Sequence, residues 1–126
     1  LACAQPDVFA GFVPVSGTFW QQPPSQCASP AASIVHLHGD ADSTVPLDGR
    51  AIGPTRQGKV SAALAMYSAL GGFDAPNSVI AGPLRCDRSA NKAGEILEFC
   101  LFEGGHSFRT EYLAYALERL KAAGRL

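Results

Sequence analysis

Apolar residues fall into short runs separated by loop-forming segments along most of the chain. Residues 11–17 and 33–39 form two nearly continuous apolar runs, which is typical of strands buried on both faces of a sheet. Residues 78–86 and 95–102 form two more, and the polar stretch DRSANKAG between them predicts a turn. The pattern therefore predicts four short strands.

Two further segments carry the spacing of helices. Apolar side chains recur at steps of three and four within residues 58–70, and Gly71 and Gly72 then end the predicted helix. A second helix is predicted after Thr110, a plausible N-cap, and it ends at Gly124. Residues 1–5 resemble the last turn of a helix stopped by Pro6. The apolar positions of the two full helices are Val60, Ala63, Leu64, Tyr67, Leu70, Tyr112, Leu113, Ala116, Leu117 and Leu120.

The order of these elements alternates strands with helices, as in layered α/β proteins. We therefore expect an α/β fold with a mainly parallel sheet flanked by helices. The chain of 126 residues has the length of one small domain. A sheet of four strands with an open edge also leads us to expect that N-terminal partners of the sheet are missing.

Composition narrows the class of partner. The chain is 47% hydrophobic and 17% charged with a net charge of −1, which argues against a disordered tail and against a basic nucleic-acid surface. No apolar run has the length of a membrane span. We therefore expect a neutral small molecule or polymer as partner, with no nucleic acid and no membrane.

Four cysteines add a prediction about compartment and cross-links. No pair has the C-x-x-C spacing of a zinc site, and an even number favours disulfides in an oxidising compartment, secreted or periplasmic. Cys86 and Cys100 can sit on adjacent strands across the DRSANKAG turn, so we predict a bond between them. We predict a second bond from Cys3 to Cys27, which ties the opening segment to the following loop.

The segment IVHLHGDADSTVP, residues 34–46, carries the strongest chemical signal. A buried strand ends in His-Gly, and Asp42 follows three residues after the glycine. The motif GGHSF places His106 in a glycine-flanked loop between the last strand and the last helix. An acid after one strand and a histidine after the next is the order of triad partners in α/β-hydrolases.

Three segments resemble polyhydroxybutyrate depolymerase and feruloyl esterase-like proteins of the α/β-hydrolase class: LACAQPDVFAGFVPVSG, HLHGDADSTVPLDGRAIG and EGGHSF. The resemblance implies a partial α/β-hydrolase fold in which residues 1–126 are the C-terminal half of the catalytic domain. It also implies that Asp42 is the acid and His106 the general base of a triad whose serine precedes Leu1. The implied function is carboxylic ester hydrolysis without a cofactor, on a small ester or polyester, completed by the missing N-terminal half and absent from this chain alone.

The loop of residues 40–50, here called the acid loop, contains three aspartates. Among them we choose Asp42 as the partner that orients the His106 ring. Asp40 directly follows Gly39 and is expected to bond the turn that leaves the strand. Asp48 lies beyond Pro46, where the chain already heads away. An Asp42 oxygen should then lie within about 3.2 Å of a His106 ring nitrogen.

Other side chains offer weaker alternatives. Ser16 follows a strand, but it lacks the preceding glycine and following helix of a nucleophile elbow, so we reject it. His36, His38 and Asp40 spell H-x-H-x-D, a fragment of a zinc motif, although support of the acid loop by His38 is the simpler interpretation. Phe19, Trp20 and Phe108 can line a pocket or fill a core. A non-catalytic, disulfide-linked secreted domain that binds a polymer or small molecule is the alternative function.

Overall fold

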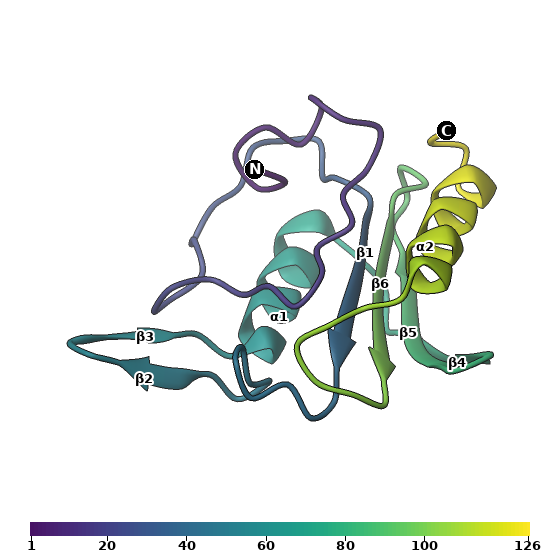
Figure 1. Ribbon diagram of the computed structural model, residues 1–126. Coiled ribbons are helices and arrows are strands. Elements are labelled where there is room, and N and C mark those ends of the chain that lie inside the picture. Colours follow the sequence, from purple (N-terminus) through teal and green to yellow (C-terminus); the bar gives the residue numbers. More distant parts are fainter.

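The structure, a computed structural model, describes residues 1–126 as a four-stranded sheet with two helices and a separate hairpin (Figure 1). The main sheet has the strand order β1-β6-β5-β4. Its strands are β1 (Ile34–Gly39), β4 (Asn77–Ala81), β5 (Leu84–Ala90) and β6 (Ile96–Phe102). The hairpin of β2 (Arg50–Ile52) and β3 (Thr55–Gln57) projects from the body. No strand was predicted from the sequence for these residues.

The prediction of a mainly parallel sheet is wrong. Only β1 and β6 pair in parallel, whereas β5 pairs antiparallel with both β6 and β4. The connections explain the difference: Gly82 and Pro83 alone separate β4 from β5, and residues 91–95 separate β5 from β6. Such short links join antiparallel neighbours, while parallel neighbours need a long crossover. The predicted strand 78–86 is therefore two strands folded at Gly82, whose φ is 57°.

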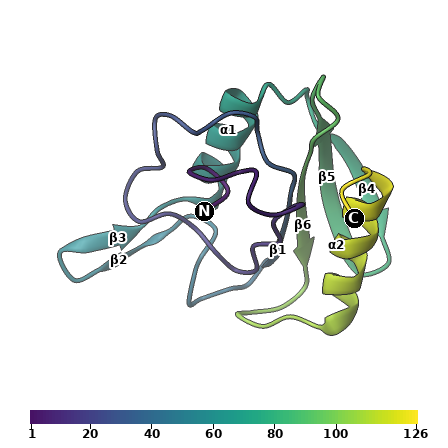
Figure 2. The ribbon, with the colours of Figure 1, turned by 90° about the horizontal axis from the view of Figure 1, so that it is seen from above.

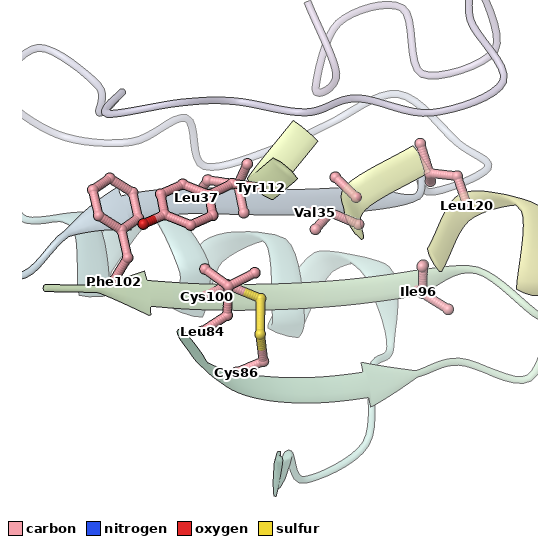
Figure 3. Packing of buried hydrophobic residues seen from close by; sticks show 10 residues of the cluster. Val35, Leu37, Leu84, Cys86, Ile96, Cys100, Phe102, Tyr112 and Leu120 are labelled. Atoms are coloured by element: carbon pink, nitrogen blue, oxygen red, sulfur yellow. A yellow bond between two sulfur atoms is a disulfide. The ribbon is translucent and has the colours of Figure 1, made fainter. Parts of the chain in front are cut away.

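The two helices pack on opposite faces of the main sheet (Figure 2). Helix α2 (Thr110–Ala122) presents Tyr112, Ala116 and Leu120 to the larger core cluster, which includes side chains of β1, β5 and β6 (Figure 3). Helix α1 (Val60–Gly71) lies on the other face, where Leu64 and Tyr67 pack against Ile34 and Leu97. Helix α2 begins after Arg109, so Thr110 is its first residue rather than its cap.

A buried carboxylate fastens α2 to the sheet. Glu98 of β6 is fully buried; Tyr115 donates its hydroxyl to Oε2 at 3.0 Å, and Arg119 donates Nε to Oε1 at 2.5 Å. Arg88 of β5 lies 3.4 Å from the same carboxylate. Because removal of one partner would leave a buried charge uncompensated, these contacts fix how α2 sits on β6.

The N-terminal segment is mostly irregular and covers one side of β1 (Figure 1). The predicted strand at residues 11–17 is reduced to two parallel bridges, Phe12 with Ile34 and Val15 with Leu37. A single turn at the start is closed by the bond from the Gln5 N–H to the Leu1 carbonyl, at 2.8 Å. This segment therefore runs parallel to β1 without forming a full strand.

Both predicted disulfides are confirmed. Cys86 and Cys100 face each other on β5 and β6 with 4.1 Å between their α-carbons, and the bond lies inside the core (Figure 3). Cys3 and Cys27 are joined with 4.6 Å between their α-carbons. Two disulfides are typical of an oxidising or extracellular environment. Neither helix has the length and apolar character needed to cross a membrane.

Candidate catalytic site

Three neighbouring chain segments deliver polar residues to one edge of the main sheet. Residues 12–15, β1 and β6 all run in the same direction, because both the bridges to β1 and the β1–β6 pairing are parallel. Ser16 follows the first segment, the loop containing Asp42 follows β1, and the loop containing His106 follows β6. Carboxyl ends of parallel strands meet at the same edge, which is where α/β proteins commonly place their sites.

Backbone hydrogen bonds join the loop after β1, which contains Asp42, to the end of β6 and the loop that follows it, which contains His106. The Ala41 N–H donates to the Gly104 carbonyl at 2.8 Å, and the Asp40 N–H donates to the Phe102 carbonyl at 2.9 Å. A β-carbon added to Gly39 would lie only 2.3 Å from the Gly105 carbonyl oxygen. Glycine at position 39 is therefore required for this approach, which brings Asp42 within reach of His106.

Asp42 is held in a fixed orientation by four contacts. Its Oδ1 accepts the N–H groups of Thr44 at 2.9 Å and Val45 at 2.8 Å, while its Oδ2 lies 2.9 Å from Nδ1 of His106. The His38 Nε2 lies a further 3.6 Å from Oδ2. Burial raises the pKa of the Asp42 carboxyl, but the hydrogen bonds from Val45, His106 and Thr44 outweigh burial and bring the pKa below its usual value. Asp42 is therefore a carboxylate at neutral pH.

The contact predicted between Asp42 and His106 is confirmed, at 2.9 Å. Asp40 instead accepts the Gly104 N–H at 3.2 Å and an Arg85 guanidinium hydrogen at 2.8 Å, rather than bonding its own turn as expected. The hydrogen bond from Arg85 is the main reason why the pKa of Asp40 is lowered. Asp48 is exposed in the turn before β2 and makes no side-chain contact with His106. Of the three aspartates, Asp42 alone holds the imidazole.

The charge on Asp42 sets the tautomer of His106. A carboxylate oxygen accepts a hydrogen bond, so Nδ1 carries the proton, and a neutral His106 then has its lone pair on Nε2. His106 remains accessible, with 43% of its side chain exposed. It is therefore an oriented base at the surface, supported from behind by a buried acid.

An open pocket of about 420 Å³ lies in front of His106. Its lining consists of Val15, Ser16, His106, Ser107 and Phe108. Phe108 is thus at the pocket, while Trp20 is exposed and Phe19 packs near Tyr67, with 6.1 Å between ring centroids. Of the three aromatic residues considered from the sequence, only Phe108 lines the pocket beside His106.

His36 and His38 lie behind the acid loop as a stacked pair, with 3.1 Å between His36 Nε2 and His38 Nδ1. The His38 Nε2 lies 2.9 Å from the Val45 carbonyl, to which it donates, so Nδ1 of His38 accepts from His36. The hydrogen bond from His38 Nε2 to the Val45 carbonyl supports the acid loop, as the simpler interpretation predicted. No group of three or more His, Cys, Asp or Glu side chains is arranged to hold a metal ion.

The conformation and burial of Ser16 were not anticipated from the sequence. This residue adopts a φ of 52°, is 8% exposed and has a hydroxyl with no hydrogen-bond partner. A positive φ at a serine depends on tertiary contacts, so no local sequence pattern predicts it. Its position directly after an apolar run was the one available signal.

Neither a scan against protein-family models nor a search of curated proteins finds a match to this chain. The oriented pair of Asp42 and His106, with the pocket in front of it, is thus the main indication of what the protein does.

Proposed function

We propose that Asp42 and His106 are the acid and the general base of a carboxylic ester hydrolase that works by serine acyl transfer. The observation that carries the proposal is the 2.9 Å contact between the His106 Nδ1 and a buried Asp42 carboxylate oxygen. This arrangement leaves Nε2 to exchange protons with groups in the pocket. The motif resemblance to polyhydroxybutyrate depolymerase and feruloyl esterase-like proteins supports the same assignment.

The nucleophile in this proposal is a serine in the full-length protein, N-terminal to Leu1. Its hydroxyl oxygen attacks the ester carbonyl carbon while its proton moves to Nε2 of His106. The Asp42 carboxylate stabilises the imidazolium that forms, and Nε2 then returns the proton to the departing alkoxide. Water repeats the sequence on the acyl-enzyme, with the proton again passing through Nε2, and releases the acid. Backbone N–H groups of the same N-terminal part would stabilise the oxyanion.

The proposed substrate is a neutral ester, either a small aromatic or hydroxyalkanoate ester or a polyester. Apolar side chains of Val15 and Phe108 line the pocket beside His106, and no acidic or permanently charged basic side chain lines it. The two disulfides support a secreted or periplasmic location.

Hydrolysis of p-nitrophenyl butyrate and methyl ferulate by the full-length protein tests this function. His106→Ala and Asp42→Asn should each lower kcat/KM by on the order of 10³-fold or more, because triad members act as a unit. Asp48→Asn is the matched control: it neutralises an exposed aspartate of the same loop and should leave kcat/KM within about twofold.

The function is wrong if folded His106→Ala protein hydrolyses both esters at the rate of the unmodified protein. Thermal unfolding of each variant provides the check on folding. Equal losses in Asp42→Asn and Asp48→Asn would also contradict the proposal, because they would show an effect of loop charge rather than of the buried acid.

A further inference from the structure

Ser16 combines two energetically unfavourable features. Its φ of 52° lies in the left-handed region, which residues with a β-carbon rarely adopt. Its Oγ is buried without a hydrogen-bond partner, although hydroxyl groups in protein interiors are nearly always paired. Glycine at this position would relieve the first cost and remove the second. Strain and unsatisfied groups of this kind cluster where proteins bind ligands.

The surrounding backbone holds Ser16 in this conformation. Val15 forms the last bridge to β1, at Leu37, and the Ser16 N–H donates to the Leu37 carbonyl at 2.9 Å. The chain therefore stays fixed to β1 up to Ser16 and turns away after it. The side chain is placed by the sheet itself, which is a rigid support for a binding group.

Ser16 and His106 line the same open pocket of about 420 Å³. Val15 and Phe108 contribute apolar surface to its lining, and Ser107 contributes a second hydroxyl. A pocket with apolar surface and neutral donors fits a neutral molecule that carries acceptor oxygens. The carbonyl or alkoxy oxygen of an ester is an acceptor of this kind.

We infer that the Ser16 hydroxyl donates a hydrogen bond to an oxygen of the ester bound in front of His106, and so positions the substrate. The inference rests on the proposed function. Ser16 is not assigned the role of nucleophile, because no helix follows it: residues 17–33 have no helix whose N–H groups would face an oxyanion. Its hydroxyl remains intact throughout the reaction.

Kinetics of Ser16→Ala and Ser16→Gly in the full-length protein test this role. We expect the KM for p-nitrophenyl butyrate to rise about three- to tenfold with kcat within twofold, since a hydrogen bond made equally to substrate and transition state changes KM alone. Ser61→Ala, which alters an exposed serine of α1, is the control and should change neither constant.

Stability separates substrate contact from a structural role. Both Ser16 variants should unfold at the same temperature as the unmodified protein or higher, because they remove an unpaired buried hydroxyl, and Ser16→Gly also relieves the positive φ. An unchanged KM overturns the inference. So does a lower unfolding temperature in both variants, which would mean that Oγ bonds another part of the protein. If His106→Ala abolishes hydrolysis while Ser16→Ala leaves KM unchanged, the proposed function survives and only this inference fails.

Discussion

His36 is a buried imidazole next to a second imidazole, and both features act on its protonation. Burial is the larger cause, and the nearby His38 adds to it, so that the pKa of His36 falls from 6.5 to about 3. In the unfolded chain the same side chain takes up a proton near pH 6.5. Between these two values the unfolded state binds more protons, and lowering the pH therefore destabilises the folded state.

As the pH is lowered from 6 to 4.5, His36 should therefore reduce the free energy of unfolding by about 1.4 kcal/mol per pH unit. In His36→Gln this contribution should vanish, because the amide keeps a donor for His38 Nδ1 but does not titrate. Urea unfolding at several pH values measures both slopes. Asp42, with its lowered pKa, loses its stabilising effect only near and below pH 4, outside this window. Parallel slopes for the two proteins would refute the effect of burial on His36.

Contacts that follow from chain order could be predicted, while conformations that depend on tertiary geometry could not. Asp42 and His106 lie in loops after β1 and β6, which are parallel neighbours in the sheet, so topology alone brought them to one edge. The preference for Asp42 over Asp40 also held, although Asp40 is occupied by Arg85 and Gly104 rather than by its own turn. The strained Ser16 was not recognisable, because its φ is imposed by the bridge to β1.

Among the elements, β6 has the central place: it pairs with β1 on one side and β5 on the other, and the His106 loop follows it. The disulfide from Cys86 to Cys100 fixes β5 to β6 within the core, where these residues are 2% and 0% exposed. This bond therefore restrains the unfolded chain and fills the core next to the strand that leads to the site.

Replacing both Cys86 and Cys100 by alanine should lower the free energy of unfolding by about 3 kcal/mol, as expected for a closed loop of this length. Urea denaturation under non-reducing conditions gives the value. The Cys3→Ala, Cys27→Ala protein is the matched comparison, since that bond joins irregular segments outside the sheet. A loss below about 1 kcal/mol for the first pair would contradict the structural role given to it.

Local patterns predicted element types better than their pairing. Helix α1, helix α2 and β1 lie where the apolar spacing placed them. The hairpin of β2 and β3 was missed because its strands are short and carry mainly polar or exposed side chains, which give no apolar alternation. The turn at Gly82 and Pro83 was overlooked inside an apolar run, and this error concealed the β4–β5 hairpin.

At the scale of the whole molecule, two antiparallel pairs and one parallel pair make a mixed sheet with a helix on each face. The parallel part, formed by residues 12–15, β1 and β6, carries the candidate site at its carboxyl edge. The antiparallel part, β5 and β4, extends the sheet on the far side of β6. The error about overall sheet type therefore left the predicted contact between Asp42 and His106 intact, because this contact depends only on the strands that are parallel.

Labelling with a fluorophosphonate followed by peptide mass spectrometry tests most directly whether Asp42 and His106 serve a serine nucleophile that lies outside residues 1–126. We expect one adduct on the full-length protein, on a serine N-terminal to Leu1, and we expect His106→Ala to abolish it because the serine then lacks its base. The 126-residue chain alone should remain unlabelled. Stoichiometric adduct on Ser16 or Ser107, or labelling of the full-length protein that is unaffected by His106→Ala, would contradict the account.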